Sequence, residues 1–216
     1  MNLSRPAKAV LGPVVDRCYD VRVEGLAHVP EGPAVLAANH LSATDAVFLA
    51  LAAPRPVTFI AKAEYFDRRR TAWFLRATGQ IPLRRGNGAA AGRALADAGG
   101  VLAHGGLVGV FPEGTRSRDG YLHRGNTGPA RLALESGVPV VPVGLVGTDA
   151  VLAPDERVPH LFRGVTVRFG PPLQLHRDPT AHDKTTLRLG SDSLMHAIAA
   201  LSGQTYVDRF AERAIA

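Results

Sequence analysis

A histidine and an aspartate follow an apolar segment closely enough to work as a pair. The run Ala34–Ala38 leads through Asn39 to His40, and Asp45 comes five residues after the histidine. Histidine is the side chain best suited to proton transfer near neutral pH, and a carboxylate beside it fixes the tautomer and stabilises the imidazolium. The spacing therefore predicts a general base, His40, oriented by Asp45. The structural alternative is a helix cap, because Ser42-x-x-Asp45 also resembles a capping box.

A second segment combines an acidic, a flexible and a basic residue after another apolar run. Leu107–Phe111 is followed by Pro112 and by the turn Glu113–Ser117, which reads EGTRS. Gly114 allows the backbone to approach a ligand, and the planar guanidinium of Arg116 can form two parallel hydrogen bonds with a phosphate. The pattern predicts an anion site at the end of a strand. An ordinary polar turn, with Arg116 paired to its acidic neighbour, is the alternative.

Two adjacent arginines end a third apolar run. Ile81–Leu83 is followed by Arg84 and Arg85. In open α/β sheets the carboxyl ends of the strands border one crevice, so these arginines could join the same phosphate site. An arginine pair is also a common surface feature, and alone it indicates little.

Short apolar runs alternate with helical patterns along the chain. The predicted strands are Val21–Glu24, Ala34–Ala38, Val57–Ala61, Ile81–Leu83, Leu107–Phe111, Val140–Leu145 and Val165–Phe169. The predicted helices are Leu3–Asp16, Thr44–Ala52, Phe66–Ala77, Ala89–His104, Gly128–Ser136 and Thr185–Leu201. This alternation predicts an α/β fold with a mostly parallel central sheet of about seven strands and helices on both faces. Gly147–Arg163 lacks a clear period and is predicted to be a long surface loop.

Length and composition favour one domain, residues 1–216, that needs neither disulfides nor metal. A chain of 216 residues can bury a sizeable core. The single cysteine, Cys18, cannot form an internal disulfide and suits a reducing compartment. The sequence contains no Cys/His zinc pattern. The net charge of +6 favours an anionic partner such as phosphate or lipid headgroups, although genomic base composition accounts for it equally well.

The sequence predicts contact with a membrane surface and no span through it. The longest apolar run, Ala46–Ala53, is far shorter than the ~20 residues that a span needs, and we find no convincing signal peptide. Tyr65–Arg76 interleaves aromatic and basic side chains like an interfacial helix, although a core-packed amphipathic helix has the same pattern. An amphipathic helix over residues 1–18 is expected to pack on the domain or on the membrane. We therefore expect a peripheral protein on the cytoplasmic face of the cell membrane.

Together these segments resemble the glycerolipid acyltransferases of the lysophosphatidate acyltransferase type. That family's first block, Asn-His-(four residues)-Asp, is matched by Asn39, His40 and Asp45. Its second, a strand ending in Ile-Pro and a following Arg, is matched by Ile81, Pro82 and one of Arg84 or Arg85. Its third, Phe-Pro-Glu-Gly-Thr-Arg-Ser, is matched without a gap by Phe111–Ser117, and its fourth by the proline-punctuated strand Val138–Val143. The blocks follow the family order over about half of the chain.

The resemblance implies direct acyl transfer from a thioester. His40 would take the proton of an acceptor hydroxyl while Asp45 holds the imidazole, and acyl-CoA or acyl-carrier protein would serve as cosubstrate. No cofactor, metal or nucleic acid is implied. The expected acceptor is a lysophospholipid, above all 1-acylglycerol-3-phosphate giving phosphatidic acid; another lysolipid or a glycolipid is the alternative. The implied substrate-binding residues are Lys62, Arg84, Arg85, Glu113, Gly114, Thr115 and Arg116.

The chain departs from the family pattern near its first arginine cluster. Lys62–Phe66 matches a family block, but Asp67–Arg70 replaces the apolar, proline-containing stretch that often follows. The longer N-terminal hydrophobic helices of many members are also missing from this sequence. Both differences leave the mode of membrane attachment and the identity of the acceptor open.

Two other classes of protein compete with this interpretation. Gly86–Gly92 follows a strand and opens a helix as a dinucleotide loop does, which would fit a nucleotide-dependent oxidoreductase. Its GxGxxxG spacing is wrong, however, and an acidic residue is missing at the expected distance of ~20 residues. A non-catalytic lipid- or nucleic-acid-binding module would fit the charge, but the sequence contains no recognised nucleic-acid motif and such a module would not require His40 and Asp45 together.

Overall fold

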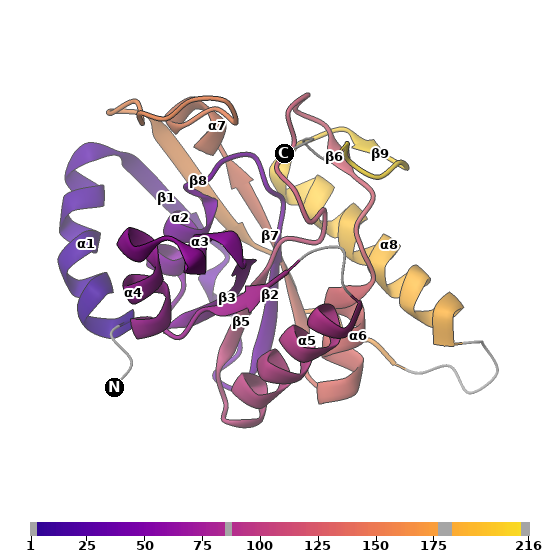
Figure 1. Ribbon diagram of the computed structural model, residues 1–216. Helices are drawn as coiled ribbons and strands as arrows, with labels where there is room; N and C mark the ends of the chain where they lie inside the picture. Colours follow the sequence, from indigo (N-terminus) through magenta and orange to yellow (C-terminus); the bar gives the residue numbers. More distant parts are fainter. Residues whose placement is uncertain (1–3, 85–87, 177–182, 213–216) are drawn as a thin grey trace.

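A seven-stranded sheet forms the centre of the molecule (Figure 1). The computed structural model describes residues 4–84, 88–176 and 183–212. In the order β1-β8-β7-β2-β5-β3-β4, the strands are Asp20–Glu24, Gly164–Phe169, Val140–Val146, Ala34–Ala38, Leu107–Val110, Val57–Lys62 and Ile81–Leu83. The strands from β7 to β4 are parallel, β8 is antiparallel to β7, and β1 is parallel to β8. The prediction of an α/β fold with a mostly parallel seven-stranded sheet is confirmed.

Strand β2 shows why both faces of the sheet carry helices. All of its residues are apolar and buried, and successive side chains point to opposite sides. Leu36 lies in one core with Leu49 of α2 (Asp45–Ala52) and Val15 of α1 (Ser4–Cys18). Val35 lies in the other core, which is covered by α5 (Gly88–Ala103), α6 (Gly128–Ser136) and α8 (Asp183–Ser202). The sheet is therefore the middle of three layers, as Figure 1 shows.

The prediction of a single helix over Phe66–Ala77 is wrong. The chain forms two short helices, α3 (Glu64–Asp67) and α4 (Arg69–Ala77), because Arg68 between them is extended, with φ −90° and ψ 118°. This break turns the aromatic side chains in different directions, so that Phe66 is buried while Trp73 and Phe74 are exposed. The common aromatic face that a continuous helix would have had does not form.

Several short elements have no counterpart among the predicted ones. The segment predicted to be a surface loop begins with a helical turn, α7 (Thr148–Val151), and a 3₁₀ turn, η1, covers Leu26–His28. A second, two-stranded sheet joins β6 (Leu122–His123) to β9 (Tyr206–Val207) in parallel. Elements of two to four residues have too little periodicity to be recognised in a sequence. Strand β9 nevertheless has a clear structural effect, because it brings the chain after α8 back to the loop after β5.

The parallel strands bring the sequence motifs to one edge of the sheet, here called the carboxyl edge. The loop Asn39–Thr44 follows β2, the turn Glu113–Ser117 follows β5, and Lys62 and Arg84 stand at the ends of β3 and β4. The carboxyl edge therefore gathers the predicted site residues that the structure describes.

In the described part of the chain, no helix has both the length and the apolar character to span a bilayer.

Candidate active site

Asp45 reaches back to His40 from the first turn of α2. Its Oδ2 atom lies 2.7 Å from His40 Nδ1 and also accepts the backbone N–H groups of Leu41, at 2.7 Å, and Ser42, at 2.8 Å. The carboxylate is fully buried, and these three donors surround one of its oxygens. The capping-box alternative is only half realised: Asp45 accepts the backbone N–H of Ser42, but the Ser42 hydroxyl donates to the carbonyl of Leu152 at 2.7 Å and does not cap α2. The five-residue spacing thus closes a loop around one carboxylate oxygen.

The contact with Asp45 determines which ring nitrogen of His40 can act as a base. A carboxylate oxygen only accepts hydrogen bonds, so Nδ1 carries the proton and Nε2 keeps its lone pair. The ring stacks on Phe111, with 4.1 Å between ring centroids and 16° between the planes, and it stays partly exposed. Among the described residues Nε2 has no hydrogen-bond partner. This nitrogen is therefore free to take a proton from a ligand.

Glu113 ties the two loops of the site together. Its Oε1 accepts the backbone N–H of His40 at 3.0 Å, and its Oε2 accepts that of His123 on β6 at 3.1 Å. Burial raises the pKa of Glu113 from 4.5 to about 7, although both N–H bonds act in the opposite direction. Glu113 was expected to bind substrate, but both of its carboxylate oxygens contact backbone N–H groups, so the geometry favours a role in positioning the two loops. Its suggested ion pair with Arg116 is not formed between these two described side chains.

Replacing Glu113 by glutamine should change how stability depends on pH. Because the folded-state pKa is raised from 4.5 to about 7, the contribution of this group to the free energy of unfolding is complete below pH 4.5 and is lost as the pH rises through 7. At about 1.4 kcal/mol per pH unit, the loss is roughly 3 kcal/mol. Glutamine cannot ionise, so the difference in unfolding free energy between the two proteins should change by this amount between about pH 4.5 and 8. Urea denaturation measures it; a constant difference would contradict a raised pKa.

The turn after β5 places Arg116 beside the loop of His40. Gly114 has φ 73°, a left-handed conformation that other residues adopt only with strain. Beyond it, the backbone N–H of Ser117 donates to the carbonyl of His40 at 2.7 Å. Thr115 and Arg116 lie between these two fixed points, half-buried, and the guanidinium makes no ion pair with any described residue. Its donors are therefore available to a ligand.

The other cationic residues lie further along the carboxyl edge. Lys62 pairs with Glu64 at 3.9 Å, and the exposed Arg84 pairs with Asp67 at 3.4 Å. Adjacent strands are about 4.8 Å apart, and β4 is two strands from β5. The backbone of Arg84 therefore lies roughly 10 Å from β5, the strand that leads into the turn of Arg116. Arg85 lies outside the described residues. Arg116 thus lies beside the loop of His40, whereas Lys62 and Arg84 lie further along the carboxyl edge.

Two residues support the site from behind in a way that the sequence did not indicate. Asn39 is fully buried and bonds both backbone groups of Leu145 on β7, accepting the N–H at 2.7 Å and donating to the carbonyl at 2.9 Å. Its amide also donates to Gln204 Oε1 at 2.7 Å, and Gln204 Nε2 donates to the carbonyl of Gly120 at 2.8 Å. Gln204 therefore joins the histidine loop to the loop after β5. It follows α8 without any motif around it, so the sequence held no signal for it.

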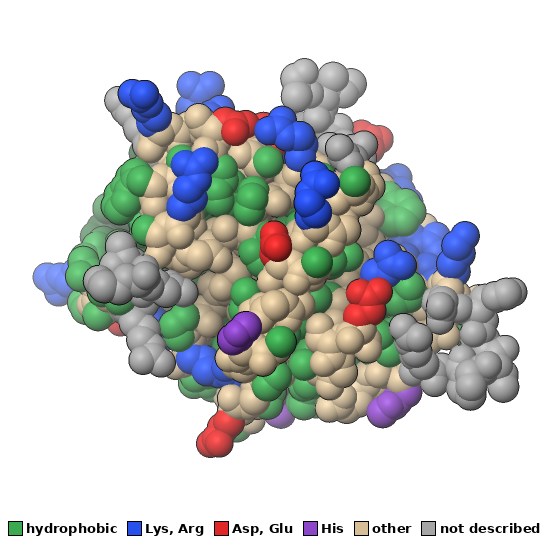
Figure 2. Space-filling view, turned by 60° about the horizontal axis from the view of Figure 1, so that its bottom comes forward, with side chains coloured by type: hydrophobic (Ala, Val, Ile, Leu, Met, Phe, Trp, Pro, Cys, Tyr) green, Lys and Arg blue, Asp and Glu red, His purple; other side chains and the backbone are tan. Residues whose placement is uncertain are grey.

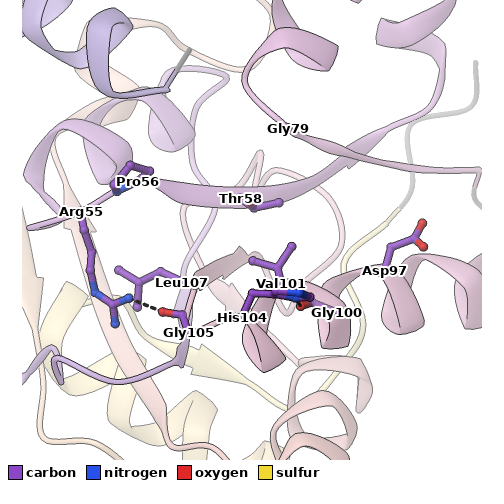
Figure 3. A pocket seen from close by; sticks show the side chains of 11 residues that line it. Arg55, Pro56, Thr58, Gly79, Asp97, Gly100, Val101, His104, Gly105 and Leu107 are labelled. Carbon is purple, nitrogen blue, oxygen red and sulfur yellow. Dashed lines mark hydrogen bonds between the residues drawn. The ribbon is translucent and has the colours of Figure 1, made fainter. Parts of the chain in front are cut away.

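A cavity of about 590 Å³ lies at the opposite, amino edge of the sheet (Figure 3). It is lined by residues at the starts of β3 and β5 and by the end of α5, among them Arg55, Asp97 and His104. The guanidinium of Arg55 is committed to backbone carbonyls, including that of Gly105 at 2.5 Å. On the lower side of the molecule, turned forward in Figure 2, basic, acidic and hydrophobic side chains are interspersed. None of the predicted catalytic or substrate-binding residues lines this cavity, so it is separate from the site of His40.

The described residues also contain no group of His, Cys, Asp and Glu side chains that could hold a metal ion. The site is thus built from one histidine–aspartate pair, a buried carboxylate and a free guanidinium. Such an arrangement can accept a proton from a hydroxyl and can bind an anion close to it.

This chain is similar in sequence and fold to known acyltransferases. The crystal structure of the 1-acyl-sn-glycerophosphate acyltransferase PlsC from Thermotoga maritima superposes with a TM-score of 0.68 at 25% identity, covering 93% of this chain and 83% of that one. The chloroplastic 1-acyl-sn-glycerol-3-phosphate acyltransferase LPAT1 of Arabidopsis thaliana is 34% identical over 62% of this chain and 38% of its own length. A lyso-ornithine lipid O-acyltransferase of Pseudomonas aeruginosa is 35% identical over 59% of this chain and 47% of its own.

The region of this chain that matches a family model contains every residue of the site except Gln204. The chain spans about two fifths of the length of the first curated relatives. The family described as Acyltransferase matches residues 20–146, which include the loops of His40 and Glu113 and the ends of β3 and β4. This chain belongs to the acyltransferase family.

Proposed function

We propose that the protein transfers a fatty-acyl group from acyl-CoA or acyl-carrier protein to the hydroxyl of a lysophospholipid, with 1-acylglycerol-3-phosphate as acceptor and phosphatidic acid as product. The observation that carries the proposal is the geometry of His40, whose Nδ1 is held by a buried carboxylate while Nε2 stays free. Arg116, on the adjoining turn, supplies a guanidinium without a carboxylate partner among the described residues. A general base and a guanidinium that can bind phosphate thus lie within one site.

The reaction follows from these positions. His40 Nε2 removes the proton of the acceptor hydroxyl as the oxygen attacks the thioester carbonyl, and Asp45 stabilises the imidazolium. The C–S bond then breaks, and the imidazolium returns the proton to the departing thiolate. The acyl group passes directly between substrates, since Cys18 ends α1 and belongs to neither loop of the site. We expect no cofactor and no metal ion in this sequence of steps.

A phosphate-free acceptor is the second candidate. The relative from Pseudomonas aeruginosa is named a lyso-ornithine lipid acyltransferase, and its identity to this chain is close to that of the plant relatives. The same base would serve either acceptor, so only the anion site separates them. Purified protein should be given radiolabelled acyl-CoA and acyl-carrier protein with a panel of lysophosphatidate, lyso-ornithine lipid and lysoglycolipid. Transfer to lysophosphatidate alone supports the first candidate, and absence of transfer to every acceptor would refute the proposed function.

Arg116→Lys should lower the specificity constant for a phosphorylated acceptor. A guanidinium forms two parallel hydrogen bonds with phosphate, whereas an ammonium offers only a point charge. Losing one charge-assisted contact costs about 1.5–3 kcal/mol, or roughly one to two decades in kcat/KM. The loss should be much smaller for a phosphate-free acceptor. Initial rates with both acceptors measure it, with Arg131→Lys, on the surface of α6, as a matched control. Equal losses on both acceptors would contradict the assignment of Arg116 to phosphate.

We further propose peripheral attachment to the cytoplasmic face of the cell membrane. Two groups of exposed apolar side chains support contact with a bilayer. Val10 and Val14 stand on the outer side of α1, and Trp73 and Phe74 project from α4 beside the exposed Arg69. Such apolar side chains next to basic ones are typical of interfacial helices.

A further inference from the structure

The segment after α7, residues 152–163, borders the proposed active site and is here called the rim loop. Figure 1 shows it in orange at the top of the molecule, between α7 and β8. The loop is attached to both loops of the site: Leu152 accepts the hydrogen bond from Ser42 at 2.7 Å, and Asp155 pairs with Arg118 at 3.3 Å. The rim loop is therefore fixed beside the two loops that carry His40 and Arg116.

Three large apolar side chains of the rim loop face solvent. Val158 is 75% exposed, Leu161 50% and Phe162 80%. Single exposed apolar residues are ordinary on protein surfaces, but here three within five positions concentrate apolar surface on one short stretch, called the tip of the rim loop. An exposed apolar surface next to a proposed site for a lipid substrate is typical of contact with an apolar partner.

The backbone of the rim loop holds the apolar tip outward. Phe162 has φ 59°, and among the described residues it is the only one other than glycine with positive φ. A bulky residue in this conformation is strained. The strain is maintained by two hydrogen bonds, from the N–H of Phe162 to the carbonyl of Cys18 at 2.8 Å and from the N–H of Asp20 to the carbonyl of Arg163 at 3.2 Å. These contacts hold the backbone at Phe162 in its left-handed conformation while its ring is exposed.

The charges around the tip select an anionic partner. Of the two acidic residues of the rim loop, Asp155 forms an ion pair with Arg118, and Glu156 accepts a hydrogen bond from His160 at 3.1 Å. Arg157 and Arg163 flank the tip, are exposed and form no ion pair with a described residue. An apolar tip between unpaired arginines has the composition of a membrane-interfacial element, in which apolar groups enter the acyl boundary and cations pair with lipid phosphates.

We propose that the rim loop docks the protein on an anionic bilayer, with Val158, Leu161 and Phe162 at the acyl boundary and Arg157 and Arg163 among the headgroups. This contact turns the carboxyl edge of the sheet, with His40, toward the membrane. The proposal rests on the proposed function in that the acceptor is taken to be a bilayer lipid. The tip is also joined to α1, because the carbonyl of Cys18, the last residue of that helix, accepts the N–H of Phe162.

The double substitution Leu161→Asn/Phe162→Asn tests the proposal. Asparagine tolerates the left-handed conformation, so the change removes apolar surface without adding strain. Partition should be measured by cosedimentation with vesicles of phosphatidylglycerol and phosphatidylcholine, without substrates. We expect the double variant to bind roughly ten- to a hundred-fold more weakly than wild type. The control is Leu189→Gln, which removes a side chain of similar exposure, 62%, from α8 and should bind like wild type. Equal partition of double variant and wild type, or no partition of wild type, would overturn the proposal.

A fluorescent probe places the tip directly. Phe162→Trp in a Trp73→Phe background has one tryptophan, because Trp73 is the only tryptophan of the chain. Its emission should shift to the blue when vesicles are added, and brominated lipids should quench it. An unchanged spectrum at vesicle concentrations that sediment the protein would show that another surface binds the bilayer.

Activity measurements separate this proposal from the proposed function. With a water-soluble, short-chain acceptor, the double variant should transfer acyl groups from acyl-CoA at the wild-type rate, and its defect should appear only with vesicle-borne acceptor. A wild-type protein that partitions as expected but transfers no acyl group would refute the function and leave the docking surface standing. A double variant that binds vesicles normally and loses rate only with acyl-carrier protein would identify the tip as a protein-docking site and overturn the membrane proposal.

Discussion

His40→Ala should lower turnover by about two to four orders of magnitude without unfolding the protein. The side chain is partly exposed and its Nε2 has no protein partner among the described residues, so its removal takes away the base and leaves the core intact. The stacking of the ring on Phe111 is lost, but Phe111 still packs near Phe59, with 6.1 Å between ring centroids. The change should therefore act on kcat far more than on the melting temperature.

Single-turnover rates with saturating acyl-CoA measure this effect. His104→Ala is a suitable control, because that histidine is exposed at the amino edge, away from both motif loops. It should leave the rate unchanged. If folded His40→Ala protein retained near-normal turnover, the proposed base and the direct transfer mechanism would both have to be abandoned.

Asp45→Asn should be nearly as damaging, with a loss of about two orders of magnitude in turnover. An amide oxygen can still accept hydrogen bonds, but it carries no charge to stabilise the imidazolium of His40. The variant should also be less stable by about 1–3 kcal/mol, because Asp45 Oδ2 accepts the N–H groups of Leu41 and Ser42 in a buried position. Rates must therefore be compared at a temperature where both proteins are folded.

Combining both substitutions separates a catalytic role of Asp45 from a structural one. If the aspartate acts only through the histidine, His40→Ala/Asp45→Asn should be about as slow as His40→Ala alone. Independent losses that multiply would mean that Asp45 serves the fold of the loop and not the proton transfer.

The sheet could be predicted from sequence because its central strands are buried on both faces. Strand β2, for example, is a run of five apolar residues, and such runs are hard to mistake when glycine, proline and polar residues bound them. The helix break at Arg68 could not be predicted in this way. The residues around it continue a helical pattern, and the extended backbone there is decided by tertiary contacts that bury Phe66.

In the candidate site, too, local contacts could be predicted from the sequence and long-range contacts could not. The link between His40 and Asp45 is local, so the spacing of the two residues sufficed to suggest it. The position of Glu113 is different, because its carboxylate meets two backbone N–H groups, and backbone partners leave no trace in a sequence. Membership of Arg84 in the phosphate site stays a prediction; its pairing with Asp67 means that binding a phosphate there would require breaking that ion pair.

The contact of Asn39 with Gln204 also bears on how the protein folds. It joins residues 165 positions apart, whereas the histidine and the aspartate are separated by five. Closing a long loop costs more chain entropy than closing a short one, and distant contacts slow the search for the native state. The proton-transfer pair can therefore come together with its own short loop, while the amide that braces this loop arrives only with the end of α8. Recovery of activity during refolding should consequently report closure of the chain's longest loops, and pairing of the central strands alone should not restore it.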